Sequence, residues 1–212
     1  MKNEIAIVLD TAKKIHPLLP DLIEEGMEFV PYLGSFLQFR KMNRFDRRIK
    51  ENSKKLEKIS KLCSDSLLSE ELIKERVFPI VLSDLIEEHE DAKINLILNG
   101  FENVFIEEKT NESVVISYFD ILRNLRYADI KRFLYFADET FDYPNYPDLS
   151  EERALTRNID GKLGKLGLIN ISATWINLDG HDNDNDRENV SLTLYGTKFA
   201  EFILSDENVL SN

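Results

Sequence analysis

Apolar side chains recur every three or four residues along roughly the first half of the chain, which is the spacing of helices with one buried face. Prolines divide this pattern, because proline lacks the amide hydrogen that a helix interior needs. The pattern predicts helices over residues 3–16, 20–30, 32–62, 72–86 and 93–105. The third is the longest helix that we predict. Pro79 lies inside the fourth and should kink or split it.

The pattern changes beyond residue 112. Two further short helices are predicted, over residues 113–124 and 128–137. Two prolines make residues 142–148 a loop. Ser150, followed by two acidic residues, suits the start of a helix that we expect to reach about residue 166. Two strands are expected after it, over residues 168–178 and 190–194.

The C-terminal succession of helix, strand, acidic loop, returning strand and Gly-containing helix is how a winged helix closes. We therefore expect a mainly α fold, with helical N-terminal and middle regions and a C-terminal winged-helix-like unit containing a two-stranded β-hairpin. The predicted regions are an N-terminal helical region with a long basic helix, a helical middle and a winged-helix-like domain, at residues 1–64, 65–112 and 113–212.

Composition narrows the classes of protein. A chain of 212 residues, 42% hydrophobic, can bury a core, and its formal charge of −12 opposes general attraction to nucleic acid or anionic lipid. The single Cys63 excludes an intrachain disulfide and a cysteine-rich zinc site. Charged residues interrupt the N-terminal pattern, and we find no apolar run of about 20 residues, so we expect a cytoplasmic protein.

Positive charge is concentrated between Arg40 and Lys61. This segment holds ten lysines and arginines against three acidic residues, a net charge of +7 that leaves −19 for the rest of the chain. It could dock on an anionic membrane, bind nucleic acid, or pack against the acidic segments 70–75 and 87–91. With the aromatic stretch before it, it supplies the candidate contacts to a partner or membrane: Phe29, Tyr32, Phe36, Phe39, Arg40, Lys41, Arg44, Arg47 and Arg48.

No residues suggest catalysis, and we predict no catalytic, cofactor-binding or metal-binding residue and no cofactor. The three histidines, His16, His89 and His181, are far apart and lack the paired spacing of a zinc hydrolase. There is no Gly-rich phosphate loop and no nucleophile elbow. Residues 182–193 have the alternating aspartates of a calcium loop but lack its central glycine and final glutamate, which favours a solvated hairpin tip.

Binding of DNA by the winged-helix-like unit is disfavoured by charge. The presumed wing, residues 179–187, has four aspartates and one arginine, so it would repel a phosphate backbone. The presumed recognition helix has four cations against three acidic residues. A winged helix that contacts protein, or has a purely structural role, fits better. Tyr143 and Tyr146, on the proline-braced loop, are further candidates for contact with a partner.

From about residue 88 the chain resembles the bacterial abortive-infection alpha family, a group of helical proteins associated with defence against phage. The resemblance lies in segments of loosely similar apolar and glycine spacing, at residues 88–98, 118–125, 129–134, 163–169 and 192–199. A tryptophan expected near residues 99–104 is absent, and the loop at 142–148 has no counterpart. The resemblance implies antiviral defence in a bacterium, without an agreed chemistry.

We therefore expect a non-enzymatic protein-interaction module, in bacterial antiviral defence, with a protein partner that the sequence does not identify. One alternative is a winged-helix DNA-binding regulator that uses the basic helix. The other is an effector that associates with an anionic membrane surface. Homo-oligomers are compatible with all three.

Overall fold

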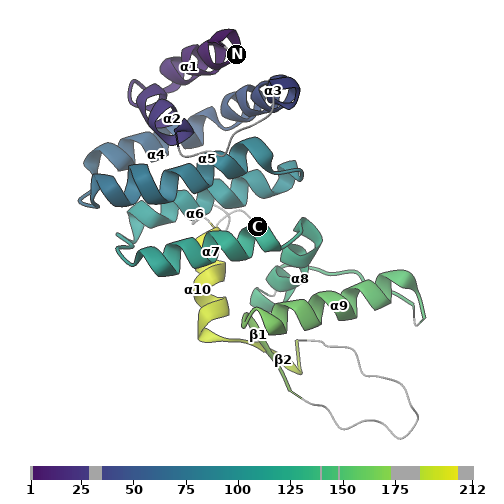
Figure 1. Cartoon of the computed structure of the whole chain (residues 1–212). Coiled ribbons are helices and arrows are strands. Elements are labelled where there is room, and N and C mark those ends of the chain that lie inside the picture. The colour runs from purple at the N-terminus through teal and green to yellow at the C-terminus, as the bar shows by residue number, and fades with distance from the viewer. Residues whose placement is uncertain (1, 29–34, 139, 148, 173–186, 205–212) are drawn as a thin grey trace, which may run out of the picture. The chain divides into compact units, whose positions relative to one another are not determined.

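The computed structural model describes residues 2–28, 35–138, 140–147, 149–172 and 187–204. The chain divides into two compact units (Figure 1). Unit 1 comprises Met1–Arg123 and Phe202–Asn212, and unit 2 comprises Asn124–Glu201. The described residues are mostly helical with one two-stranded antiparallel sheet, so the predicted mainly α fold with a β-hairpin is confirmed.

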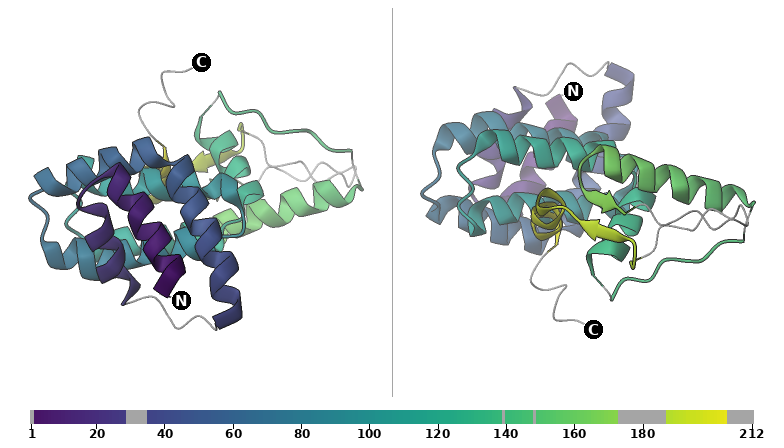
Figure 2. Two further views of the ribbon diagram at one scale, coloured as in Figure 1. Left: turned by 90° about the horizontal axis from the view of Figure 1, so that it is seen from above. Right: turned by 90° about the horizontal axis from the view of Figure 1, so that it is seen from below.

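Unit 1 is built from helices whose apolar faces pack on one another. In chain order they are α1 (Lys2–Ile15), α2 (Leu19–Met27), α3 (Ser35–Glu51), α4 (Ser53–Asp65), η1 (Glu71–Val77), α5 (Phe78–Glu87), η2 (Asp91–Lys93), α6 (Ile94–Ile106) and α7 (Glu112–Asn124). Helix α6 packs on α4 and α5, while α1 packs on α2 and α3. Seen from above in Figure 2, α1 lies on the outer side of this unit. Gly26 lets α2 approach α5 closely, since a Cβ there would come 2.9 Å from side-chain atoms of Phe78 and Leu82.

Pro79 divides the predicted fourth helix, as expected. Segment η1 is a π-helix that leads directly into α5, and the amide of Phe78 bonds to the carbonyl of Ile73, five residues earlier. In an uninterrupted α-helix the Pro79 ring would clash with the carbonyl of Glu75 and leave that carbonyl without a donor. The wider π turn before the proline accommodates this conflict.

The prediction of one helix over residues 32–62 was wrong. Asn52 separates α3 from α4, with φ −105° and ψ 20°. Its side-chain amide donates a hydrogen bond of 2.9 Å to the carbonyl of Arg48. A short polar side chain that bonds its own backbone competes with the regular helix, and the apolar pattern does not register this competition.

Unit 2 contains α8 (Tyr127–Ala137), α9 (Glu151–Lys165), β1 (Ile169–Ile171), β2 (Val190–Leu192) and most of α10 (Leu194–Ile203). The strands pair antiparallel, with Asn170 opposite Ser191. We predicted a longer strand, over residues 168–178, but residues 173–178 lie outside the described residues. Most of the predicted wing, residues 179–186, also lies outside them.

Both ends of α9 are capped by local hydrogen bonds. The Ser150 hydroxyl accepts from the amide of Arg153 at 3.1 Å, which confirms the predicted helix start. At the other end Gly167 adopts φ +71°, and the amide of Leu168 reaches back to the carbonyl of Leu163 at 3.1 Å. Glycine adopts this left-handed conformation without steric cost, so the chain can turn directly from α9 into β1.

The end of α10 belongs to unit 1, so the chain divides differently from the three predicted regions. Phe202 packs against Tyr118 and Phe119, with ring centroids 5.0 and 5.2 Å away. The side-chain amide of Asn99 donates to the carbonyl of Ile203, and that of Asn103 donates to the carbonyls of Phe202 and Leu204. These amides satisfy the last carbonyls of α10, which have no partner within the helix.

Candidate functional site

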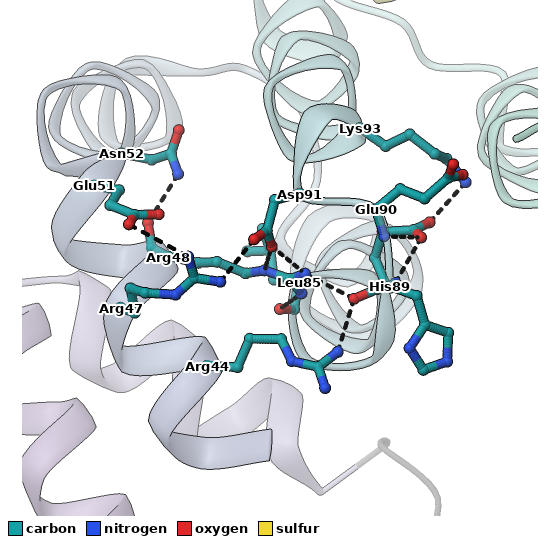
Figure 3. A network of polar contacts seen from close by, with 11 residues as sticks. Arg44, Arg47, Arg48, Glu51, Asn52, Leu85, His89, Glu90, Asp91 and Lys93 are labelled. Atoms are coloured by element: carbon teal, nitrogen blue, oxygen red, sulfur yellow. Dashed lines mark hydrogen bonds and ion pairs between the residues drawn. The ribbon is translucent and has the colours of Figure 1, made fainter. Parts of the chain in front are cut away.

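Four cations of α3 bond to the end of α5 or to the turn between α5 and α6. Lys41 Nζ lies 2.5 and 2.6 Å from the two carboxylate oxygens of Glu87. Arg44 donates to the backbone carbonyl of Glu88 at 3.0 Å (Figure 3). The carbonyls at the end of a helix carry partial negative charge, so cations are stabilised beside them.

Arg48 is the centre of this network, and its side chain is only 1% exposed (Figure 3). It donates to the carbonyls of Leu85 and Glu88, both at 2.7 Å, and to Asp91 Oδ1 at 2.7 and 3.1 Å. Arg47 donates to the other oxygen of Asp91 at 2.7 Å. These bonds, that from Arg47 most of all, hold the pKa of the Asp91 carboxyl below its ordinary value.

Glu88 organises the same turn with its side chain. One carboxylate oxygen accepts from the amides of His89 and Glu90 at 2.6 and 2.9 Å. The other lies 2.6 Å from the ammonium of the buried Lys93. Burial alone would raise the pKa of Glu88, but the bonds from Lys93 and the two amides outweigh it, and the pKa is lowered. The arrangement fixes the conformation of the turn.

Two cations of α4 bond to a buried carboxylate of α6. Lys55 and Lys58 lie 3.1 and 2.7 Å from the carboxylate of Glu102, a buried residue of α6. Lys55 also donates to the side-chain oxygen of Asn99. Burial would raise the pKa of Glu102, yet the two lysines outweigh it and lower the pKa.

Eight of the ten cations between Arg40 and Lys61 therefore bond to an acceptor among the described residues: Lys41, Arg44, Arg47, Arg48, Lys50, Lys55, Lys58 and Lys61. Four of them, Lys41, Arg44, Arg47 and Arg48, bond to the acidic segment 87–91, which favours packing of α3 against that segment. Lys50 and Lys61 instead make exposed ion pairs within their own helices. The other acidic segment, 70–75, bonds instead to Lys74 and Arg76 within its own stretch.

The remaining predicted contact residues of this region are placed as follows. Phe29 and Tyr32 lie outside the described residues. Phe36 and Phe39 belong to α3, and Arg40, on the same helix, is exposed. Their contact with a partner or membrane stays a prediction.

A second cluster lies in unit 2, around the buried Arg132 of α8. Arg132 donates to both carboxylate oxygens of Asp160 on α9, at 2.8 and 3.0 Å, and both residues are buried. Three aromatic rings surround its guanidinium carbon, with the centroids of Phe136, Tyr143 and Tyr135 at 4.4, 4.9 and 5.0 Å. An arginine bonded to a carboxylate can also stack on aromatic faces, which fixes the position of each ring.

Two further arginines attach the connection between α8 and α9 to the rest of unit 2. Arg187 donates to the carbonyls of Tyr135, Asp138 and Phe141, at 2.5–3.1 Å. Arg153 donates to the carbonyl of Tyr146 at 2.8 Å. Figure 2 shows this connection running beside α9 toward the first turn of that helix.

The two predicted contact tyrosines belong to this cluster. Tyr143 packs on Arg132, and its ring centroid lies 6.4 Å from that of Tyr146. Both side chains are half-buried. Contact of these tyrosines with a partner remains a prediction.

The connection ends in an exposed leucine that the sequence did not single out. Leu149 has φ 65° and a relative exposure of 104%, and Leu155, within the first two turns of α9, is 56% exposed. The bond from the Ser150 amide to the carbonyl of Pro147, at 3.2 Å, closes the turn around Leu149. A non-glycine residue in the left-handed region is uncommon and points to a local constraint.

Arg153 and Lys162, which belong to the cations of α9 that we considered for DNA recognition, make internal bonds. Arg153 bonds to Tyr146, and Lys162 donates to the carbonyl of Asn124 and to Asp129, both at 2.6 Å. These bonds direct the two side chains toward their own unit.

The buried Arg132–Asp160 pair was also missed by sequence reasoning, although a signal for it exists. Each residue follows or precedes buried apolar residues, Ile130 and Phe133 in α8 and Ile159 and Leu163 in α9. An ionisable residue at an apolar position of a helix is expected to have a partner. Which residue that partner is depends on helix packing, which the spacing does not give.

A search of the described residues for metal-binding clusters and membrane-spanning helices, and comparisons with known proteins, assign no further site or family. Within the described residues, no three side chains of the metal-binding types come together as a cation site. No described helix combines the length and apolar character that crossing a bilayer requires. Comparisons with protein-family models, with curated proteins and with solved structures found no match.

Proposed function

We propose that this protein is a non-enzymatic protein-interaction module, and that its contact surface is the connection 138–150 together with the first two turns of α9. The observation that carries the proposal is Leu149, a leucine held in a left-handed conformation with its side chain fully exposed. Both the left-handed backbone and the exposed leucine side chain are energetically unfavourable in the isolated chain.

The conformation is costly in the absence of a partner. A left-handed backbone costs a residue other than glycine about 1–2 kcal/mol. The Leu149 side chain recovers none of this cost by burial in its own unit. Burying a leucine on another protein contributes about 1.5–3 kcal/mol, so a partner would offset the strain.

The surface is also held in advance of binding. Arg187 and Arg153 fix the backbone of the connection, and Tyr143 packs on the buried Arg132. A rigid loop loses little conformational entropy when it binds, which favours affinity. The exposed Glu151 and Glu152 beside Leu149 suit a partner with basic and apolar residues and disfavour a phosphate backbone.

We place the module in bacterial antiviral defence because of the resemblance described above. The test is protection of a bacterial host that expresses the full chain and is challenged with phage. Replacing Leu149 and Leu155 together with aspartate should abolish protection, because two charges would be buried on binding. Leu67→Asp is the matched control, since Leu67 is 89% exposed and belongs to unit 1.

A photo-crosslinking residue at position 149 supplies the molecular readout, compared with one at position 67. We expect a discrete protein adduct from position 149 only. Full protection by the doubly substituted chain, with equal crosslinking from both positions, would refute the assignment of this surface. Circular dichroism of each variant verifies folding.

The two alternative functions are tested on the same chain. Gel shift at low salt tests for duplex DNA binding, and flotation with anionic vesicles tests for membrane association. The informative variant is Arg40→Glu with Lys54→Glu, because both side chains are exposed. Arg48 is unsuitable, because its removal would disturb the core of unit 1. Salt-sensitive binding that this variant abolishes would favour one of the alternatives.

A further inference from the structure

Helix α9 packs one side against the rest of unit 2 and presents the other side to solvent. Its buried residues are Ile159, Asp160 and Leu163. The exposed positions on the opposite side recur every three or four residues, so they form one stripe along the helix. This α9 stripe consists of Glu151, Ala154, Asn158, Gly161 and Lys165, and Leu155 lies at its edge with an exposure of 56%.

The two charged residues of the α9 stripe lie at opposite ends of the helix. Glu151 is the first residue of α9 and Lys165 is the last. At 1.5 Å per residue they are about 21 Å apart along the axis, which is too far to pair within one chain. Neither side chain has an ion pair or hydrogen bond within the described part of the chain, whereas Lys162 of the same helix bonds to Asp129 at 2.6 Å. The α9 stripe therefore has one acidic end and one basic end, each without a counter-ion among the described residues.

This arrangement is self-complementary for two antiparallel copies of the helix. If the Asn158 residues of two copies face each other, residues equally far on either side of Asn158 meet across the pair. Glu151 and Lys165 both lie seven residues from Asn158, so each end would meet the opposite charge. Leu155 and Gly161 both lie three residues from it, so each leucine would meet a glycine. A Cβ at Gly161 would have no atom within 4 Å, which leaves space for the incoming side chain.

We infer that the partner of the contact surface proposed above is a second copy of this chain, bound through antiparallel α9 helices about a twofold axis at Asn158. The inference rests on that proposed surface, because the pairing uses Leu155 and brings Leu149 near the exposed Gly167 turn of the second copy. The second copy supplies the basic and apolar residues that this surface suits. One pair of helices makes a small interface, so we expect a weak dimer that dissociates on dilution.

Sedimentation velocity of the purified full chain measures the dimer as a function of concentration. Glu151→Lys and Lys165→Glu should each weaken it by about fivefold or more, because each change places like charges in both symmetric pairs. An equimolar mixture of the two variants should recover the wild-type affinity within about twofold, because every substituted residue then meets an opposite charge.

Glu152→Lys is the matched control for the charge reversals. It changes the net charge by the same amount as Glu151→Lys, at an exposed position about 100° further round the helix and outside the α9 stripe. It should change the affinity by less than about twofold. Leu149→Asp combined with Leu155→Asp should leave the chain monomeric, because the pairing would bury both charges.

Three results would overturn the inference: a wild-type chain that stays monomeric at all concentrations, a dimer that neither charge reversal weakens, and a mixture that associates no more tightly than either variant alone. The proposed function fails separately. A monomeric chain that crosslinks from position 149 to a different protein would overturn the dimer and support the proposed surface. A dimer that behaves as expected, with full phage protection by the Leu149 and Leu155 variant, would support the pairing and refute the role of this surface in defence.

Discussion

Each unit buries one arginine, but the two arginines have different kinds of partner. Arg48 in unit 1 bonds to two backbone carbonyls and to Asp91, whose side chain is 53% exposed. Arg132 in unit 2 bonds to the buried carboxylate of Asp160 and is surrounded by aromatic rings. The first joins α3 to the end of α5, and the second positions the connection that leads to Leu149.

The difference determines how each pair responds to loss of its carboxylate. Without Asp91, Arg48 would keep both carbonyl acceptors and remain satisfied. Without Asp160, Arg132 would lose the buried carboxylate that accepts two of its hydrogen bonds, and removing one member of a buried ion pair is strongly destabilising. The burial of an arginine therefore does not by itself predict how much stability is lost when its carboxylate partner is removed.

The largest effect is expected for Asp160→Ala, which should lower the free energy of unfolding of unit 2 by about 3–5 kcal/mol. Urea denaturation measures the loss, and hydrogen exchange localises it to unit 2. Replacing the pair together, Asp160→Leu with Arg132→Met, should restore much of the stability, because no charge then stays buried. Equal destabilisation by the single and the double change would contradict this account.

Gly196→Ala should be nearly as damaging, at about 3 kcal/mol or more. A Cβ at this position would lie 2.0 Å from the backbone carbonyl oxygen of Leu168, and neither atom can rotate away, because the backbone fixes the position of both. Gly161→Ala is the control, since a Cβ there meets nothing within 4 Å. Thermal unfolding of both variants gives the comparison, and similar melting temperatures would show that β1 and α10 are not held closely together.

Arg48→Met should cost unit 1 about 2–3 kcal/mol, because the buried Leu85 carbonyl loses its bond from Arg48 and the Glu88 carbonyl keeps only the bond from Arg44. Arg40→Met, on the same helix but exposed, should change the unfolding free energy by less than about 0.5 kcal/mol. Equilibrium urea unfolding measures both changes. Equal values would mean that the Arg48 network adds nothing beyond a surface charge.

Asp91→Asn should have the smallest effect, about 1 kcal/mol or less, because the carboxylate is largely exposed and screened by solvent. Because the pKa of Asp91 is lowered in the folded chain, its contribution to the free energy of unfolding depends on pH. The stabilisation is present above the unfolded-state pKa of about 3.9 and is lost as the pH falls through the folded-state value. The unfolding free energies of the wild-type chain and the variant should therefore converge only when the pH falls below the lowered folded-state pKa of Asp91, and a difference that persists in still more acidic solution would exclude the carboxylate as its source.

The fold could be predicted from the sequence where a single helix or strand carries its own signal. Apolar spacing located most helices, Pro79 marked a division, and Ser150 marked the start of α9. The predictions that were wrong or incomplete concern features set by a side-chain bond to the backbone or by the packing of helices. The break at Asn52 follows from one side-chain bond to the Arg48 carbonyl, and the partner of each buried charge depends on which helices meet.

The candidate contact surfaces were also only partly predictable, because the sequence does not show which segments pack together. The cluster of cations from Arg40 to Lys61 was evident in the sequence, but charge counting could not show that an acidic turn lies against it. Leu149 was invisible for another reason. A leucine in a loop carries no signal in the sequence of its backbone angle or of its exposure.

Because Phe202 and the residues after it complete unit 1, unit 2 is inserted in the sequence between two parts of its neighbour. A ribosome must therefore finish all of unit 2 before the last aromatic ring of unit 1 can reach its place beside Tyr118. Until then the nascent first unit lacks that ring, and the inserted unit is the first of the two whose sequence is complete.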